Sequence, residues 1–503
     1  MTNGAENHTS RERLCDETLA RLPSTIQRPS YDRASVSPGI VHIGLGAFSR
    51  AHLAVYTDDV LQHGATDWGI VGINFASRAM REALKPQDCL YTLLSRGNDE
   101  DRPRVIGSLL DVMMLSDQRQ AAFDLLASPE IRIVSLTVTE KGYCQDTTTG
   151  GLDENHPAII ADLANPLEPE SVPGFLTEAI RLRRDAGHAP FTVLVCDNLP
   201  RNGEKVRDIT ARFAHLRDPE LGRFIRENVS FPCTMVDRIT PATQDADRQA
   251  VAASLGVEDA WPVVTEPFRQ WVIEDRFPLG RPAWEKAGAL MVDDVHPFEM
   301  MKLRCLNGAH STLAYLSVVA GIETVTDAMA DAHLPKIIRR LWDDDLVASL
   351  PDVPGTDVPA YTRDLEARFQ NRAVRHLTLQ ISADGSQKLP PRLLAVAREI
   401  YAGGGEPKVI PLAIAGWMRF LAGKNETGHD YAVADPHADE LTAIARNAAG
   451  DAERLTDGLL AVRGIFGDDL PANPHFRAAV GTHLSSLMSQ GVEQTLKTFL
   501  NGN

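Results

Sequence analysis

A lysine, an asparagine and a histidine stand close together near residue 300, and these side chains can exchange protons and hydrogen bonds with an alcohol. Lys302, Asn307 and His310 follow one another along the chain, and Glu299 comes just before them. Drawn as an α-helix at about 100° per residue, the four side chains fall within an arc of about 140° that also holds two leucines. We therefore expect this face of the helix to be at least partly buried.

Burial would give this group a specific chemistry. A lysine that loses hydration has a more accessible neutral form near neutral pH. The neutral amine of Lys302 could take a proton from an alcohol while hydride leaves the same carbon. Asn307 could donate to the developing oxygen, and His310 could fix a neighbouring hydroxyl. On spacing alone, the stronger interpretation is an amphipathic helix whose polar residues face water.

A glycine-containing turn near residue 45 indicates a second site. Gly44 and Gly46 follow the apolar run Ile40–Ile43 and precede a helix-like segment. The first glycine permits a tight turn, and the second lets backbone amides approach a pyrophosphate. Ser49 replaces the third glycine, so the motif alone fits an ordinary turn equally well, and the strand-to-helix context favours a dinucleotide. The predicted cofactor contacts in this turn are Ile43, Gly44, Gly46, Ala47 and Phe48.

The end of the second predicted strand does not decide between NAD and NADP. An acid there would hold the ribose hydroxyls of NAD. Gly69–Ile73 instead runs into a segment without an acid that ends at Arg78, which could face a 2′-phosphate. Both cofactors are therefore compatible with these residues.

Polar residues also follow two other apolar runs. Asn198 comes after Val193–Val195, and Asp237 with Arg238 comes after Phe231. Polar side chains at the carboxyl ends of parallel strands line the ligand crevice of open α/β sheets. Asn198 opposite Asn307 would complete a site with two donors for an oxyanion. The alternatives are a turn residue at the strand end and a structural ion pair between the aspartate and the arginine.

The composition of the whole chain is that of an ordinary globular protein. The 503 residues are 43% hydrophobic and 24% charged, and the net charge of −17 argues against nucleic acid as a partner. Apolar runs are too short for a membrane span, and the polar N-terminus lacks a signal core. Six scattered cysteines without a CxxC pair fit free thiols in the cytoplasm better than disulfides or a zinc site.

The order of predicted elements indicates the fold class. Buried strands that alternate with helices predict a parallel sheet covered on both faces. The predicted strands are Ile40–Ile43, Gly69–Ile73, Ile131–Val138, Thr192–Val195 and Pro262–Thr265. Beyond about Asp294, long helical segments dominate. We predict an N-terminal arm (1–38), a Rossmann-type dinucleotide-binding α/β domain (39–294) and a mainly α-helical C-terminal substrate domain (295–503).

Five ordered segments resemble the long-chain, zinc-independent polyol dehydrogenases, the family of mannitol 2-dehydrogenase and fructuronate reductase. The last segment carries the family's Lys-x4-Asn-x2-His signature, and the resemblance covers most of the chain from about Pro29 onward. The segments are Gly39–His52, Thr137–Tyr143, Cys196–Gly203, Val236–Pro241 and Lys302–His310.

The resemblance implies an active site in the cleft between a Rossmann domain and a helical domain, with NAD or NADP and no metal. Lys302 matches the family's catalytic base, and Glu299 matches a carboxylate that gates a proton channel to this lysine. Asn198 and Asn307 match the oxyanion pair. The residues that match those around the substrate hydroxyls are His310 and Asp237. We also assign Arg78 and Glu140 to the cofactor site.

One stretch separates the branches of the family. Mannitol dehydrogenases usually carry Asn-Pro-x-x-x-Asp-Thr-x-x-Arg before an Asp-Gly-Ser loop, and here Arg372, His376 and Gln380 replace the Pro, Asp and Arg. The stretch from His376 to Lys388, and segments 415–420 and 464–471, look like fructuronate reductase. The absence of an acid at 376 avoids repelling a substrate carboxylate. Candidate cations for that carboxylate are Arg375, His376 and Lys388, although Arg375 could equally face solvent.

These observations predict a cytoplasmic, metal-independent fructuronate reductase with NAD, or with NADP. It would transfer hydride reversibly between the cofactor and the keto group of D-fructuronate to give D-mannonate, with Lys302 as general acid and base. The alternatives are a mannitol 2-dehydrogenase or related polyol dehydrogenase, and a dinucleotide-binding sensor that has lost its chemistry. The expected binding partner is a small sugar acid or polyol, and neither nucleic acid nor a membrane is expected to bind. The protein would be a monomer or a homo-oligomer.

Overall fold

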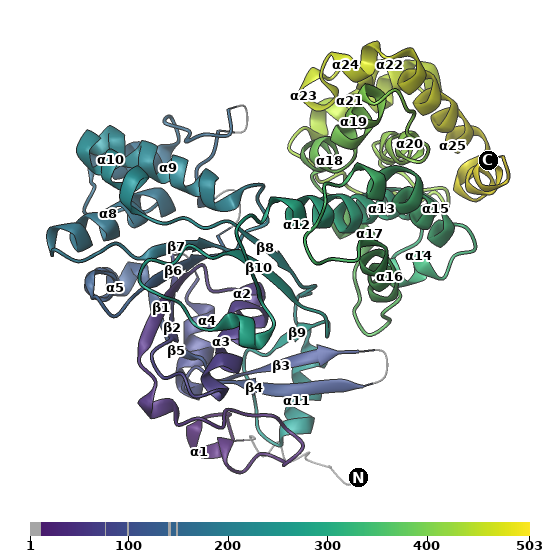
Figure 1. Cartoon of the computed structure of the whole chain (residues 1–503). Coiled ribbons are helices and arrows are strands. Elements are labelled where there is room, and N and C mark those ends of the chain that lie inside the picture. The colour runs from purple at the N-terminus through teal and green to yellow at the C-terminus, as the bar shows by residue number, and fades with distance from the viewer. Residues whose placement is uncertain (1–11, 76, 98–99, 139–141, 147–148, 503) are drawn as a thin grey trace, which may run out of the picture. The chain divides into compact units, whose positions relative to one another are not determined.

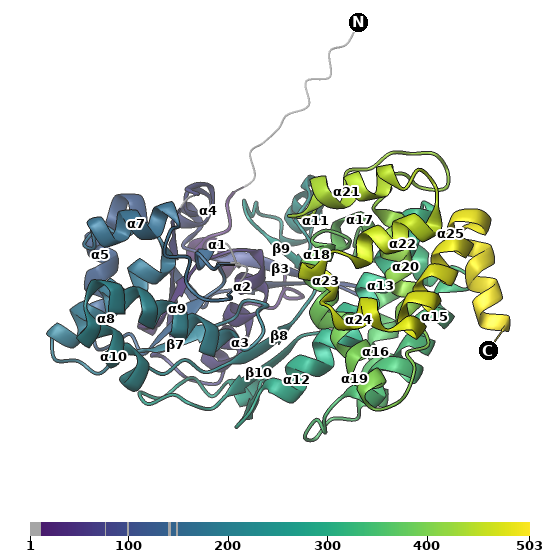
Figure 2. The same cartoon turned by 90° about the horizontal axis from the view of Figure 1, so that it is seen from above.

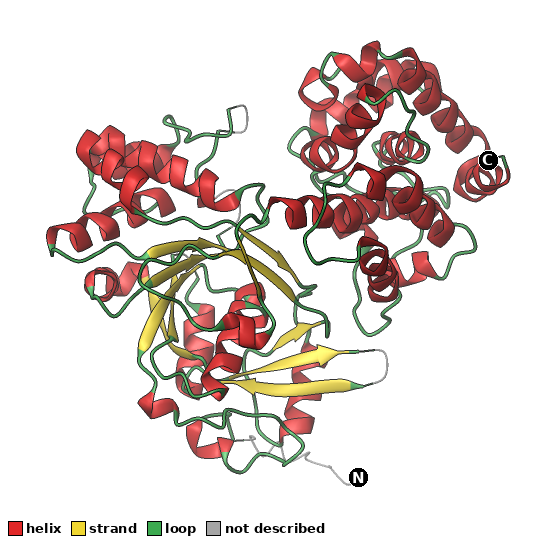
Figure 3. Ribbon diagram, viewed as in Figure 1, coloured by secondary structure: helices red, strands yellow, loops and turns green. Residues whose placement is uncertain are grey.

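The computed structural model describes residues 12–502 except 76, 98–99, 139–141 and 147–148. The chain forms two compact units, Met1–His296 (unit 1) and Pro297–Asn503 (unit 2). Unit 1 combines strands with helices, whereas the described part of unit 2 is helical (Figure 3). The predicted fold class, a Rossmann-type α/β domain followed by a mainly helical domain, is confirmed.

A parallel sheet organises unit 1 (Figure 1). Within the described ranges it has five strands in the order β5-β2-β1-β6-β7, and every neighbouring pair is parallel. From β1 the chain adds β2 and then β5 on one side, and β6 and β7 follow on the other side of β1. The switch point, where Rossmann folds bind their ligands, therefore lies between β1 and β6. The strands are β1 (Pro38–Ile43), β2 (Gly69–Asn74), β5 (Leu109–Met114), β6 (Ile133–Leu136) and β7 (Thr192–Val195).

Both faces of this sheet are apolar, which explains why its strands read as continuous apolar runs. In β7, Val193 and Val195 belong to one buried cluster and Leu194 to another on the opposite face. The helices of unit 1 up to β8 are α2 (Ala47–Ala51), α3 (Leu53–Gln62), α4 (Ala79–Leu84), α5 (Leu115–Ala127), α7 (Pro157–Ala164), α8 (Val172–Asp185), α9 (Asn202–Arg217) and α10 (Pro219–Asn228).

Two smaller sheets complete unit 1. In one, β10 (Gln270–Glu274) pairs parallel with β11 (Leu290–Val292) and antiparallel with β8 (Thr234–Asp237). In the other, β3 (Tyr91–Arg96) pairs with β4 (Asp101–Ile106) and β9 (Val263–Thr265). The prediction of one parallel sheet is therefore wrong for the strand near Pro262 and for the strand that ends at Asp237. Local sequence indicated a strand in each case but not its pairing partner. Helix α11 (Asp245–Leu255) lies between β8 and β9 in the sequence.

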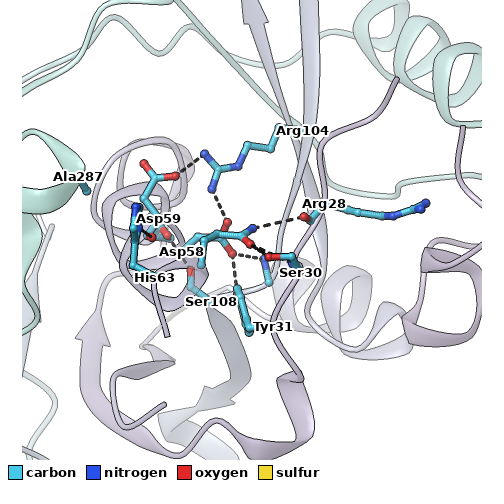
Figure 4. Close-up of polar contacts among 12 residues, drawn as sticks. Arg28, Ser30, Tyr31, Asp58, Asp59, His63, Arg104, Ser108 and Ala287 are labelled. Carbon is cyan, nitrogen blue, oxygen red and sulfur yellow. Dashed lines mark hydrogen bonds and ion pairs between the residues drawn. The ribbon is translucent and has the colours of Figure 1, made fainter. Parts of the chain in front are cut away.

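The described part of the N-terminal segment is tied to unit 1. Helix α1 (Asp16–Leu19) lies in it, and several of its apolar side chains are buried. Figure 4 shows the polar anchor, in which Tyr31 Oη donates to Asp58 of α3 at 2.6 Å. Arg104 forms ion pairs with Asp58 and, at 2.6 Å, with Asp59. Because Asp58 is buried, these partners compensate the loss of its hydration.

Unit 2 is built from helices, and three of its turns are π-helical: η4 (Lys302–Gly308), η5 (Leu341–Leu346) and η7 (Pro390–Leu394). Helix α25 packs along α20 (Figure 2). In the described part of the chain, no helix has both the length and the apolarity needed to cross a membrane. The α-helices are α12 (His296–Met301), α13 (Ala309–Ala320), α14 (Val325–Met329), α15 (Leu334–Arg340), α16 (Val358–Phe369), α17 (Thr378–Ile381), α18 (Gly385–Leu389), α19 (Ala395–Ala402), α20 (Ile410–Phe420), α21 (Ala438–Asn447), α22 (Ala452–Leu460), α23 (Arg463–Phe466), α24 (Asp469–Ala472) and α25 (Pro474–Asn501).

Candidate active site

The segment that carries the lysine is a helix with a π-turn in its middle. Helix α12 begins where the His296 backbone N–H donates to Asp294 Oδ1 at 2.9 Å, and it continues through η4 into α13. The predicted arc, which assumed 100° per residue throughout, is therefore wrong. A π-turn bonds residue i to residue i+5, so Lys302 and Asn307, which are five positions apart, lie one above the other on the same side of the helix.

The lysine face of this helix is buried within the protein. Lys302 is 9% exposed, Asn307 8% and His310 7%. The expectation of a buried face is confirmed, and the alternative of a polar stripe in water is wrong. Glu299, one turn earlier in α12, is partly exposed. Unit 2 thus brings three of the four predicted catalytic side chains onto one helix.

His310 and His376 form an uncharged pair beside this turn. The His310 ring stacks on Phe369 with centroids 4.4 Å apart and meets the edge of His376 at 5.3 Å. Burial lowers the pKa of His310 well below its ordinary value, and the positive charges of Arg368, Arg392 and Lys302 lower it further. Burial also lowers the pKa of His376 to about 4.

Both imidazoles are therefore neutral at pH 7, and the prediction of His376 as a cation is wrong. His310 Nε2 and His376 Nδ1 are buried without a hydrogen-bond partner among the described residues. Each nitrogen can serve a ligand hydroxyl, since a neutral imidazole offers one donor and one acceptor.

The other two candidate cations differ in their surroundings. Arg375 is exposed and pairs with Glu323 at 2.5 Å, in agreement with the alternative that it faces solvent. Lys388, in α18, is mostly buried; its Nζ donates to the Ile381 carbonyl at 3.4 Å and lies 3.7 Å from Asp384 Oδ2. Lys388 is thus the one of the three candidates that combines a positive charge with substantial burial.

The glycine turn after β1 has the backbone geometry that its sequence predicted. Gly44 has a φ of +83°, and a Cβ there would lie 2.3 Å from the Thr137 carbonyl oxygen, so a larger residue would clash with the end of β6. At Gly46 a Cβ would meet one atom of the described residues within 4 Å, the Gly44 carbonyl oxygen at 3.7 Å, so these residues leave space above the turn. Ser49 replaces the third glycine and accepts from the Gly46 N–H at 3.0 Å.

The remaining turn residues frame this open space. Ile43 is fully buried, whereas Gly44, Gly46, Ala47 and Phe48 are partly exposed. The Phe48 ring stacks on His52 at 5.1 Å. Arg78 pairs with Asp117 at 2.5 Å and is otherwise largely exposed. Glu140 lies outside the described residues.

Asn198 sits on a loop that is held from two sides. Asp197, the preceding residue, accepts from the Val138 N–H at 3.1 Å and from Tyr143 Oη at 2.6 Å. Asn202 Nδ2 donates to the carbonyls of Val195, Asp197 and Thr234 at 2.9–3.1 Å. Asn198 itself is exposed at the end of β7, so a fixed backbone presents an accessible amide.

Asp237 ends β8 and is buried next to the glycine turn's helix. It pairs in register with Gln270 of β10. Its neighbour Arg238 donates to the carbonyls of Ala51, at 2.5 Å, and Glu266, at 3.1 Å, and so ties the end of α2 to β8. Arg238 therefore links the helix that follows the glycine turn to the strand that ends at Asp237.

Comparison with known proteins shows the family. The model of the mannitol dehydrogenase Rossmann domain matches residues 38–286, and that of the mannitol dehydrogenase C-terminal domain matches residues 294–488. The chain belongs to the mannitol dehydrogenase family. It is thus a member of a family of oxidoreductases that act on CH–OH groups.

Members of the mannitol dehydrogenase family with different substrates are similarly close to this chain. D-mannonate oxidoreductase of Escherichia coli (strain K12) is 44% identical over 93% of this chain and 97% of its own length. Mannitol 2-dehydrogenase of Aspergillus terreus is 39% identical over 95% and 96%. The structure of Pseudomonas fluorescens mannitol 2-dehydrogenase in a ternary complex with NAD and D-mannitol is 42% identical, has a TM-score of 0.88, and covers 98% of this chain and 100% of that one.

Sequence reasoning missed several residues that contact predicted site residues within each unit. Asp197 and Asn202 fix the Asn198 loop, and Arg392 contacts the π-turn. Asp197 and Asn202 lie in the segment Cys196–Gly203, which resembles the family. Their polar side chains just after a predicted strand were the signal that could have identified them. Arg392 lies 85 positions from Asn307, and no local pattern joins the two.

Proposed function

We propose that the protein is an NAD-dependent fructuronate reductase that interconverts D-fructuronate and D-mannonate. The observation that carries the proposal is the neutral His376 beside His310, at the position where mannitol dehydrogenases usually have an aspartate. A carboxylate there would repel a sugar acid, whereas an imidazole can donate to it.

The charges around His310 support an anionic substrate as well. Arg368, Arg392 and Lys302 all contribute positive potential at this ring. A positive potential at this point of a protein with a net charge of −17 favours a carboxylate over a neutral polyol.

The glycine turn fits NAD. Its open side at Gly46 leaves room for a pyrophosphate, and bound NADH would supply the hydride. Asp117, which pairs with Arg78, puts a negative charge beside the position where a 2′-phosphate would bind, which favours NAD over NADP. The predicted contacts are Ile43, Gly44, Gly46, Ala47, Phe48, Arg78 and Glu140.

The chain's own residues would move one proton and stabilise one oxygen. In reduction, the amides of Asn198 and Asn307 donate to the developing oxyanion, and protonated Lys302 delivers a proton to it. In oxidation, neutral Lys302 takes the proton back, and Glu299 connects the lysine with solvent. The substrate hydroxyls and carboxylate are bound by Asp237, His310, His376 and Lys388.

A substrate panel tests this proposal. D-fructuronate and D-fructose are each reduced with NADH and with NADPH while the absorbance of the reduced nicotinamide is followed. We expect kcat/KM to be highest for D-fructuronate with NADH. A clear preference for D-fructose would instead support a mannitol 2-dehydrogenase, the second candidate, which the 42% identity and TM-score of 0.88 to the P. fluorescens enzyme favour. Tight NADH binding without any turnover would indicate a sensor.

The six cysteines support a reducing compartment for this reaction. All of them are free, and five are buried. Proteins of the cytoplasm usually keep their thiols in this state, so we place the enzyme there.

A further inference from the structure

Two π-turns of unit 2 pack against each other at the candidate site. The first, η4, carries Lys302 and Asn307, and the second, η7, follows directly on α18, which carries Lys388. Gly308 lies at their contact, where a Cβ would stand 3.3 Å from Leu393 Cδ2 and 3.4 Å from the Arg392 carbonyl oxygen. The missing side chain at Gly308 therefore allows the two turns to approach closely.

Arg392 links the two turns by hydrogen bonds. Its Nη1 donates to the backbone carbonyl of Asn307 at 3.3 Å and to Ser311 Oγ at 3.0 Å. At the end of a π-turn the helical hydrogen bonds change from i+5 to i+4, which disturbs the regular pairing of carbonyls at that point. The guanidinium supplies a donor at this junction, from a part of the chain 85 positions away.

The position of this contact matters because Asn307 is a proposed oxyanion donor. A donor must be held within about 0.5 Å of its productive position to stabilise the transition state. The Asn307 side chain has only two torsions, so the backbone sets the point from which its amide reaches out. A contact on the Asn307 carbonyl therefore helps to fix that starting point.

We infer that Arg392 is a positioning residue that holds the Asn307 amide in place for catalysis. The inference rests on the proposed role of Asn307 in the reductase reaction. Because Arg392 follows Lys388 by four positions, the same contact also couples the substrate-binding helix to the oxyanion donor. Arg392 thus acts through Asn307 rather than on the reacting atoms.

The test is a double-mutant cycle on the full-length enzyme, with Arg392→Ala, Asn307→Ala and the double variant. Arg398→Ala is the matched control, since Arg398 lies on the helix that follows and also bridges a carboxylate and a carbonyl, Asp469 and Phe466. We expect Arg392→Ala to lower kcat by about 10- to 100-fold, with KM for NADH and the melting temperature as in the control. Arg398→Ala should leave kcat within about twofold.

The cycle separates positioning from a general structural role. In the Asn307→Ala background, removing Arg392 should change kcat by less than about twofold, because the residue through which it acts is already gone. An equal loss in both backgrounds would overturn the inference, as would wild-type kcat in Arg392→Ala. If Arg392→Ala does not fold, Arg392→Lys, which keeps a donor on a shorter side chain, is measured in the same two backgrounds against the same outcomes.

Failure of the proposed function can be distinguished from failure of the inference about Arg392. The cycle is run with whichever substrate the panel shows to be turned over, so a preference for D-fructose changes the proposed substrate but not the cycle. Wild-type kcat in Asn307→Ala would overturn both the oxyanion role and the inference about Arg392.

Discussion

At the scale of single residues, the candidate site depends on polar groups that the fold keeps away from water. Lys302 and Asn307 are less than one-tenth exposed, and the two histidines beside them are uncharged. A buried polar group is costly unless a partner or a ligand satisfies it. His310 Nε2 and His376 Nδ1 have no hydrogen-bond partner among the described residues, so a ligand that bonds to them would lower that cost.

Replacing the lysine tests the acid–base role. We expect Lys302→Ala to lower kcat by about 10²–10⁴-fold, which is the usual contribution of a general acid–base group. Steady-state kinetics of the hydride transfer measure this loss. Lys85→Ala, a change at an exposed lysine that pairs with Asp111, is the control and should keep normal kinetics. Near-normal turnover in Lys302→Ala would exclude the lysine as acid and base.

An acid at position 376 should select against a sugar acid. We expect His376→Asp to raise KM for D-fructuronate by about tenfold or more, because a carboxylate facing a carboxylate costs more than one kcal/mol. KM for D-fructose should change much less. His376→Asn is the matched neutral variant, and equal increases of KM for D-fructuronate in both variants would show that charge is not the cause.

At the scale of elements, the glycine turn and the π-turn place the functional groups. Gly44 holds a left-handed backbone against the end of β6, and η4 aligns Lys302 with Asn307. Both are short irregular pieces between regular elements. The two irregular turns thus determine where the glycine backbone and the Lys302 and Asn307 side chains lie, and the regular elements on either side support them.

Two effects of a side chain at Gly44 on stability can be separated, the steric overlap of its Cβ and the strain of its positive φ. Alanine in a left-handed conformation costs about 1–2 kcal/mol. We expect this loss in free energy of unfolding for Gly64→Ala, where φ is +95° and no atom of the described residues lies within 4 Å of the added Cβ. Gly44→Ala should lose clearly more than that and should weaken NADH binding, because its Cβ would also overlap the Thr137 carbonyl. Urea unfolding and NADH fluorescence titration measure the two effects; equal stability losses would contradict the clash.

The sequence predicted those elements whose signal is local. Thr192–Val195 was predicted with the bounds that β7 has, because a sheet covered on both faces needs a continuous apolar run. The pairing of β8 with β10 could not be predicted, since strand partners are chosen by tertiary contacts. The π-turn was missed because the helical wheel assumes one periodicity, and its extra residue changes neither composition nor polarity. Arg392 was missed because only folding brings it to Asn307.

At the scale of the whole molecule, buried neutral histidines are distributed over both units. His42 and His52 are fully buried in unit 1, and His310 is buried in unit 2. Burial lowers the pKa of His42 to about 4 and that of His52 to about 3. His42 bridges β1 and β6 through Ser135 Oγ at 2.8 Å and Thr137 Oγ1 at 2.9 Å. Native chains therefore resist protonation at these rings.

These histidines predict a loss of stability in mild acid. Below pH 6.5 the unfolded chain binds protons that the native chain does not, so the free energy of unfolding should fall as pH drops from about 6.5 toward 4, by up to about 3 kcal/mol for His42 alone. Urea titrations between pH 7 and pH 5 measure the slope. His42→Gln should be less stable at pH 7 but show a shallower slope, and an unchanged slope would contradict the assignment to His42.

The π-turn also determines what a change of chain length at this point would disturb. Deleting one residue between Lys302 and Asn307 would restore ordinary i+4 bonding, and α13 would keep its orientation because the π-turn holds its extra residue within one wider turn. Leu313 and Leu316 would stay buried, whereas the junction at which Arg392 meets the Asn307 carbonyl would be lost. The core of unit 2 therefore tolerates the loss of one residue here better than the contact between the two π-turns does.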